Sequence, residues 1–112
     1  MAASITSENR SLCTPVSIQS LTSTGDFQDI VSLGLVAARR AEEIYKNTVY
    51  VVAFELLCAA QGAEIRGKHL LSSATAELFQ KTRRIVPYLG SDICLTDYLE
   101  ALAGEIKQGA LS

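Results

Sequence analysis

Residues 49–61 form the stretch VYVVAFELLCAAQ, which is apolar on nearly every side once it is wound into a helix. A helix that is apolar on all its faces belongs at the centre of a larger packed structure. The run is too short to span a bilayer, and Glu55 interrupts it. Because a chain of 112 residues cannot surround such a helix, the stretch indicates packing against a partner or against further parts of the protein.

The helical pattern around this stretch extends from about residue 28 to about residue 63. No proline occurs within it, and apolar residues recur at spacings of three and four. One helix of this length would measure about 50 Å, and a break near Asn47-Thr48 is the alternative. The expected core stripe of its second half consists of Val49, Val52, Leu56, Ala59, Ala60 and Ala63.

Two shorter helices are predicted after the glycine at position 67. The first covers about 74–86, with Ser72 among its N-cap candidates and Pro87 as its stop. The second covers about 97–108 and ends at Gly109. Their expected core stripes are Ala74, Leu78, Thr82 and Ile85 in the first, and Leu99, Leu102, Ala103 and Ile106 in the second.

Residues 1–27 have no sustained apolar period. They are rich in serine, threonine and asparagine, and Pro15 restricts the backbone further. We therefore expect an extended N-terminal arm. The predicted fold class is all-α: long antiparallel helices of a bundle, preceded by this arm.

Composition and charge exclude several classes of protein. A hydrophobic fraction of 48% indicates a globular chain, and a net charge of -2 without a basic cluster argues against nucleic-acid binding. The three cysteines form no CxxC pair, so neither a metal site nor a disulfide framework is expected. Cys58 is expected to be a small buried residue. Reduced thiols and the absence of a signal peptide at the N-terminus predict a cytoplasmic protein with no membrane segment.

Few side chains suggest catalysis. His69 is the only histidine and is expected at the surface, while Glu55 is expected to pair with a basic residue on a neighbouring helix. Asp26 and Asp29 fit a helix N-terminus in the manner of a capping box. Capping leaves Gln28 unexplained. Its neutral amide can both donate and accept hydrogen bonds, so a binding role is the alternative to a purely structural one.

Five segments in order resemble a known family. They are SENR at 7–10, PVS at 15–17, QDIVSLG at 28–34, AARR at 37–40 and ELLCAAQ at 55–61. At this spacing they resemble the C-terminal part of the histidine and aromatic amino acid ammonia-lyases. The resemblance covers essentially the whole chain, and the full-length enzymes are several times longer.

The resemblance implies an all-α homotetramer whose active sites draw residues from several subunits. Members eliminate ammonia from an aromatic amino acid to give an α,β-unsaturated acid. They use a methylidene-imidazolone (MIO) electrophile formed from an internal Ala-Ser-Gly. This chain contains no Ala-Ser-Gly, so it is expected to hold no cofactor, to contain no catalytic residue of its own, and to be inactive alone. Its expected partners are further copies of itself or the missing N-terminal portion of the enzyme.

The resemblance also assigns the candidate substrate-binding residues. Gln28 occupies the position at which histidine lyases carry glutamate and phenylalanine or tyrosine lyases carry glutamine. Phe27 replaces the usual glutamine or asparagine and suggests an apolar pocket wall, and Thr24 matches a position at the pocket edge. The same features fit an MIO-type 2,3-aminomutase. A non-catalytic helical oligomerisation module, or a fragment without independent function, is the further alternative.

Overall fold

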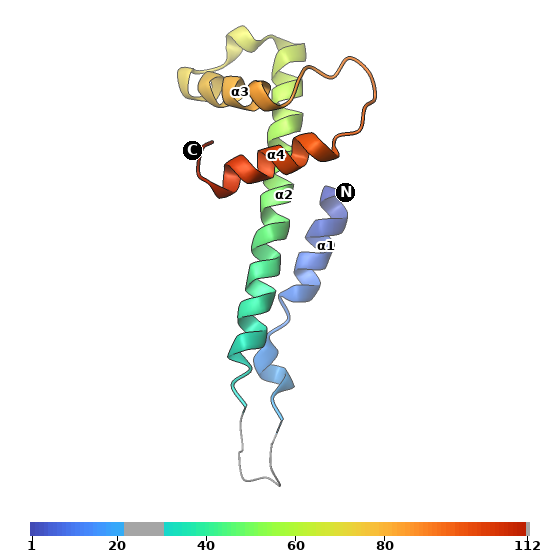
Figure 1. The fold of residues 1–112 in the computed structure, drawn as a ribbon, viewed down its shortest axis with the longest axis vertical. Coiled ribbons are helices and arrows are strands. Elements are labelled where there is room, and N and C mark those ends of the chain that lie inside the picture. Colours follow the sequence, from blue (N-terminus) through green and yellow to red (C-terminus); the bar gives the residue numbers. More distant parts are fainter. Residues whose placement is uncertain (22–30, 112) are drawn as a thin grey trace. The chain divides into compact units, whose positions relative to one another are not determined.

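The computed structural model describes residues 1–21 and 31–111, and every regular element in these ranges is helical. The elements are α1 (Ala2–Leu12), a 3-10 turn (Val16–Gln19), α2 (Gly34–Arg66), a second 3-10 turn (Lys68–Leu70), α3 (Ser73–Ile85) and α4 (Thr96–Lys107). The chain divides into two compact units, residues 1–48 and 49–112. The all-α prediction is confirmed for the described part of the chain (Figure 1).

The first unit is an antiparallel hairpin of α1 and the beginning of α2. The Asn47 side chain donates to Asn9 Oδ1 at 3.0 Å, Arg40 Nη1 donates to the Thr14 carbonyl at 2.8 Å, and Ser20 bonds to Val31. As residue numbers rise along one segment they fall along the other. The two segments therefore run in opposite directions (Figure 1).

The extended arm predicted for residues 1–27 is not confirmed, because α1 occupies Ala2–Leu12. None of the residues of α1 is buried, so the sequence of this helix shows no periodic spacing of apolar residues. Its hydroxyls bond to its own backbone: Thr6 Oγ1 donates to the Ala2 carbonyl at 2.9 Å and Ser11 Oγ to the Ser7 carbonyl at 3.4 Å. Polar contacts hold α1 to α2, and pattern analysis based on apolar spacing does not detect them.

The second unit contains the apolar core. Figure 1 shows α3 and α4 lying across the C-terminal part of α2. The buried cluster consists of Ala53, Leu57, Val86, Leu99 and Leu102. The buried residues of α4 are Leu99, Leu102 and Ala103, in agreement with its predicted stripe.

α2 is continuous from Gly34 to Arg66, without a break at Asn47-Thr48. Its buried residues are Val49, Ala53, Leu57 and Ala60. Val49 and Ala60 belong to the predicted stripe, whereas Ala53 and Leu57 lie one position after the predicted Val52 and Leu56. Cys58 is exposed in this chain, so the prediction of a buried thiol is wrong here. Since the helix is apolar all round, its sequence does not reveal which face is covered.

By length and composition alone, α2 is able to cross a membrane. The core helix of a soluble protein passes the same test. Within the part of the chain that the structure describes, 22% of the most apolar stretch of α2 is buried.

Two helix ends, the start of α3 and the end of α4, follow the sequence signals, whereas Thr96 does not cap α4: it is the first residue of that helix, and the N-cap Leu95 makes no side-chain capping bond. The Ser72 hydroxyl accepts a hydrogen bond from the Thr75 N–H at 3.4 Å, so Ser72 caps α3 as predicted. Beyond α4, Gly109 has φ +71, and its N–H donates to the Ile106 carbonyl at 3.1 Å. The next amide, of Ala110, donates to Glu105 at 3.1 Å. This pair of bonds is the Schellman motif, in which glycine supplies the left-handed residue.

Gly67 connects α2 to the following turn with φ 109 and ψ 101, a backbone region almost reserved for glycine. An added Cβ would lie 2.6 Å from His69 Cε1.

We expect Gly67→Ala to lower the free energy of unfolding by about 1–3 kcal/mol, measured by urea denaturation followed by circular dichroism. The matched control is Gly62→Ala inside α2, where nothing lies within 4 Å and a gain of roughly 0.5–1 kcal/mol is expected. Equal effects of the two substitutions would contradict the assignment.

Candidate functional site

The sequence-predicted substrate-binding residues are Thr24, Phe27 and Gln28, and they lie outside the described residues. Their roles therefore stay predictions. The structure does describe what lies on either side of them. Before them comes the short 3-10 turn Val16–Gln19, and after them the start of α2.

A two-point contact joins the two sides. The Ser20 hydroxyl accepts a hydrogen bond from the Val31 N–H at 3.2 Å and donates one to the Val31 carbonyl at 3.1 Å. Both backbone groups of Val31 are thereby satisfied by one side chain. Ser20 and Val31 are thereby held at hydrogen-bonding distance within the first unit.

Leu33 gives the chain an unusual entry into α2. Its φ of 51 lies in the left-handed region, which costs a residue with a Cβ about 1–2 kcal/mol. Its carbonyl nevertheless accepts a hydrogen bond from the Ala37 N–H at 3.1 Å, the first bond of α2. A strained, non-glycine residue at this point indicates that its surroundings fix the backbone direction.

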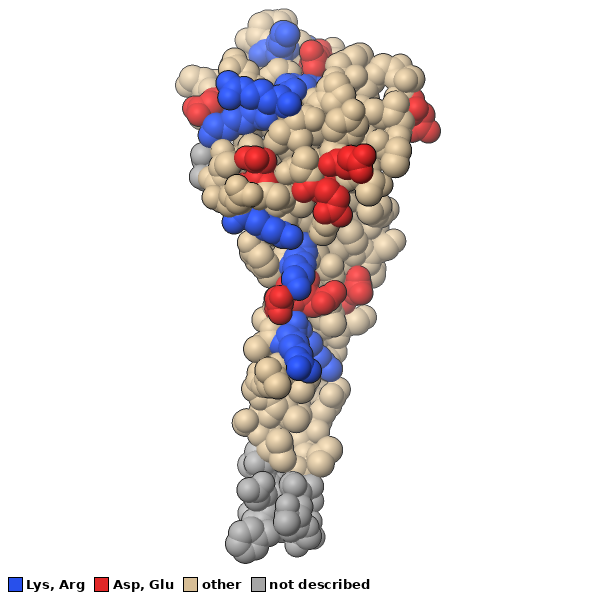
Figure 2. Space-filling model, in the orientation of Figure 1, with Lys and Arg blue, Asp and Glu red and all other residues tan. Residues whose placement is uncertain are grey.

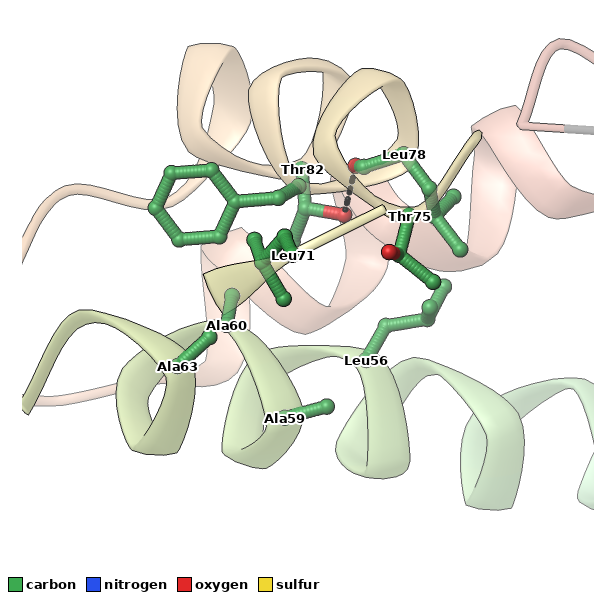
Figure 3. A pocket seen from close by; sticks show the side chains of 9 residues that line it. Leu56, Ala59, Ala60, Ala63, Leu71, Thr75, Leu78 and Thr82 are labelled. Atoms are coloured by element: carbon green, nitrogen blue, oxygen red, sulfur yellow. Dashed lines mark hydrogen bonds between the residues drawn. The ribbon is translucent and has the colours of Figure 1, made fainter. Parts of the chain in front are cut away.

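A pocket of about 140 Å³ lies between α2 and α3 in the second unit. Figure 3 shows its side chains, which converge from the two helices and from Leu71. They are Leu56, Ala59, Ala60, Ala63, Leu71, Thr75, Leu78, Phe79 and Thr82. Only two of the nine are polar.

The hydroxyls of the pocket are already engaged. Thr82 Oγ1 donates to the Leu78 carbonyl at 2.9 Å (Figure 3), and Thr75 Oγ1 lies 2.8 Å from Ser72 Oγ. Among the described residues, no charged side chain lines the pocket to orient an amino acid's carboxylate or amine. Its chemistry suits an apolar side chain and not a zwitterionic substrate.

Gln61, the last residue of the ELLCAAQ segment, anchors the loop after α3. Its Oε1 accepts from Leu89 N–H at 3.2 Å and from Arg83 Nη2 at 3.0 Å, and its Nε2 donates to the Leu89 carbonyl at 3.1 Å. Arg83 Nε also pairs with Glu64 Oε2 at 2.9 Å, and Nη1 donates to the Pro87 carbonyl at 2.8 Å. Sequence analysis did not predict this network. The only hint in the sequence was Gln61 itself, a polar amide at the end of an apolar helical segment.

Lys and Arg atoms gather over α3 on the face drawn in Figure 2. Two of the basic side chains of α3 are paired, Lys81 with Glu77 at 3.4 Å and Arg83 with Glu64. This basic surface over α3 therefore differs from a nucleic-acid-binding surface, in which unpaired cations follow a phosphate backbone. Within residues 1–21 and 31–111, no group of three metal-ligating side chains occurs.

Two side chains have perturbed proton affinities. The hydrogen bond from Tyr50 Oη to Glu100 Oε2, at 2.6 Å, raises the pKa of the Tyr50 phenol. The Thr96 backbone N–H, and then its hydroxyl, lower the pKa of the exposed Cys94 thiol. Among the residues that the structure describes, Glu55 is exposed, and the ion pair predicted between it and a neighbouring helix is not seen. Glu42 and Lys46, one turn apart on α2, form an ion pair at 2.7 Å.

Comparisons with known proteins add to this geometry. The profile of the family described as aromatic amino acid lyase matches residues 1–84. The chain is 46% identical over 111 residues to the tyrosine ammonia-lyase of Cupriavidus metallidurans, covering 98% of this chain and 21% of that protein. It is 40% identical to the histidine ammonia-lyase of Geobacillus thermodenitrificans, covering 99% and 22% respectively.

A solved structure is also similar to this chain along nearly its whole length. The phenylalanine aminomutase of Pantoea agglomerans is 56% identical and superposes with a TM-score of 0.86, over 98% of this chain and 21% of that one. The chain thus spans about a fifth of the length of the proteins it matches.

Proposed function

Because the chain belongs to the aromatic amino acid lyase family, we propose that it forms one wall of the active site of an enzyme acting on phenylalanine or tyrosine. The reaction is the elimination of ammonia to give an α,β-unsaturated acid. The observation that carries the proposal is the 46% identity to a tyrosine ammonia-lyase along nearly the whole chain. Gln28 supports the same substrate class, since a neutral amide suits a ring without an imidazole.

A 2,3-aminomutase is the second candidate. The 56% identity to a phenylalanine aminomutase favours it. Both activities need the same elimination, and they differ in whether the amine returns to the neighbouring carbon. The candidate substrate-binding residues of this chain are compatible with either activity.

The family's MIO group supplies an electrophile when it is present. This chain contains no Ala-Ser-Gly from which that group forms, so the residues present do not fit it and the electrophile must come from another segment. We therefore propose that the chain is inactive alone. Its contribution is binding: Gln28 offers hydrogen bonds to the substrate, Phe27 an apolar wall, and Thr24 a hydroxyl at the pocket edge.

Partners complete this proposal. The apolar pocket between α2 and α3 has no polar group available for a substrate, and Cys58 and Ala59 of α2 are exposed. We propose that further copies of the chain, or the remainder of the enzyme, cover these surfaces in a cytoplasmic homotetramer. An oligomerisation module without catalysis remains the alternative if Gln28 proves irrelevant to turnover.

The test is a chimera in which this chain replaces the matching fifth of the Cupriavidus metallidurans tyrosine ammonia-lyase. In it, Gln28→Ala is expected to lower kcat/KM about 10–100-fold, the loss of one or two hydrogen bonds in the transition state. The mass measured by light scattering should stay the same. Formation of the unsaturated acid from tyrosine and from phenylalanine is followed by absorbance.

Gln28→Glu serves as the matched variant, because it keeps the shape and adds a charge. It is expected to shift the ratio of kcat/KM values toward histidine. An unchanged substrate ratio together with a silent Gln28→Ala would assign Gln28 to the helix start and remove it from the pocket.

A further inference from the structure

A second cavity of the second unit, of about 290 Å³, lies between the C-terminal ends of α3 and α4. Side chains of both charges and of apolar character line it: Lys81, Arg84, Ile85, Glu105, Ala110 and Leu111. We propose that this cavity binds a free amino acid with an apolar side chain, whose carboxylate pairs with Arg84 and whose ammonium group pairs with Glu105. The proposal uses none of the residues assigned to the substrate pocket and does not rest on the proposed function.

The two charges that carry the proposal are available to a ligand. Lys81 pairs with Glu77 at 3.4 Å. By contrast, within residues 1–21 and 31–111, the side chains of Arg84 and Glu105 form no ion pair, either with each other or with a third residue. Arg84 is exposed and Glu105 is half-buried. Since arginine presents parallel N–H donors that match the two oxygens of a carboxylate, Arg84 is the residue expected to hold the acid group.

The turn after α4 places Glu105 beside the apolar end of the cavity. Gly109 has φ +71 and its N–H donates to the Ile106 carbonyl at 3.1 Å, while the Ala110 N–H donates to the Glu105 carbonyl at 3.1 Å. Ala110 and Leu111 thereby line the same cavity as Glu105. The last turn of a helix also carries the negative end of its dipole, which adds to the Glu105 carboxylate in favouring an ammonium group.

Ile85 and Leu111 supply the apolar wall of the cavity. Both are partly buried and pack against the core cluster of the second unit, so the wall is attached to the most firmly packed part of this unit. An apolar ligand side chain against it removes further apolar surface from water. Small-molecule pockets start at roughly 300 Å³, so a cavity of about 290 Å³ suits a compact ligand.

The mixture of charges favours a zwitterion over a simple ion. A phosphate or a plain carboxylic acid would meet the like charge of Glu105, and a plain amine would meet those of Lys81 and Arg84. An α-amino acid carries both charges on one carbon. It therefore satisfies Arg84 and Glu105 together and brings no net charge into the cavity.

The experiment titrates the 112-residue chain with L-leucine by isothermal titration calorimetry at low ionic strength, where exposed charges are least screened. Leucine has no aromatic ring and so is no substrate for the proposed reaction. Leucine amide, which lacks the carboxylate, and 4-methylpentanoate, which lacks the amine, are titrated in parallel. The variants are Arg84→Ala and Glu105→Gln. Their matched controls are Arg66→Ala and Glu55→Gln, at exposed positions of α2 outside the cavity, and circular dichroism checks that every variant is folded.

L-Leucine is expected to bind with a Kd near or below about 1 mM. Arg84→Ala and Glu105→Gln are each expected to raise this Kd about tenfold or more, the loss of one charge-assisted contact, whereas both controls keep the parental value. Each variant should also be insensitive to the loss of the group that it binds. Arg84→Ala is expected to leave the affinity for leucine amide unchanged, and Glu105→Gln is expected not to weaken the binding of 4-methylpentanoate.

Two results would overturn the proposal. The first is the absence of leucine binding up to about 10 mM, or a Kd that changes no more in Arg84→Ala and Glu105→Gln than in the controls. The second is binding of 4-methylpentanoate as tight as that of leucine, which would make the cavity a site for simple anions. Neither result bears on turnover by the chimera or on its Gln28 variants, so a failure here is distinguishable from a failure of the proposed function.

Discussion

Leu102→Ala is expected to lower the free energy of unfolding of this chain by about 2–5 kcal/mol, the range for leucine truncation in a packed core. The Leu102 side chain is 0% exposed and belongs to the cluster built from α2, Val86 and α4. Truncation removes apolar surface from this cluster and leaves a cavity between helices. Because small domains are stable by only about 5–15 kcal/mol, a loss of this size is a large part of the total. Urea denaturation followed by far-ultraviolet circular dichroism measures it.

Leu70→Ala is the matched control for this substitution. Leu70 is 72% exposed in the turn before α3, so its truncation is expected to change stability by no more than about 0.5 kcal/mol. A cost below about 1 kcal/mol for Leu102→Ala, or similar costs for the two variants, would show that the core of the second unit is packed differently.

The sequence was sufficient to predict the amphipathic helices. In α4 the apolar residues occupy one side only, and the predicted Leu99, Leu102 and Ala103 are the buried ones. The Ser72 cap and the left-handed Gly109 followed from local backbone chemistry, which needs no knowledge of distant parts of the chain.

The covered face of α2 and the whole of α1 were beyond prediction for opposite reasons. α2 is apolar on every side, so only its tertiary neighbours select Ala53, Leu57 and Ala60 for burial. α1 buries no residue, so it carries no apolar period. Its contacts with α2 join residues almost forty positions apart, such as Asn9 and Asn47, which spacing rules cannot connect.

The candidate site also contains residues that the sequence suggested and contacts that only the structure shows. Thr24, Phe27 and Gln28 were assigned through resemblance, and they lie outside the described residues. The hydrogen bonds between Ser20 and Val31 and the contacts of Gln61 depend on pairings across 11 and 28 positions. Such pairings follow from the folded path of the chain, and no local pattern encodes them.

Arg83→Ala is expected to lower the free energy of unfolding by about 2–3 kcal/mol, because it removes several partly buried interactions at once. The Arg83 side chain is 13% exposed, and its partner Glu64 is 28% exposed. Without Arg83, the Glu64 carboxylate loses its ion-pair partner, the Pro87 carbonyl loses its hydrogen-bond donor, and Gln61 loses one of its contacts. The partial exposure of Glu64 keeps the expected cost below that of a fully buried pair.

Three further variants separate charge from geometry. Arg83→Lys keeps the charge but cannot present the planar fork of donors, so an intermediate loss is expected. Arg84→Ala removes the adjacent, exposed arginine and should cost no more than about 0.5 kcal/mol. In a double-mutant cycle with Glu64→Ala, the second substitution should cost less in the Arg83→Ala background than alone. Strict additivity, or equal losses for Arg83→Ala and Arg84→Ala, would contradict the view that this network joins the loop after α3 to α2.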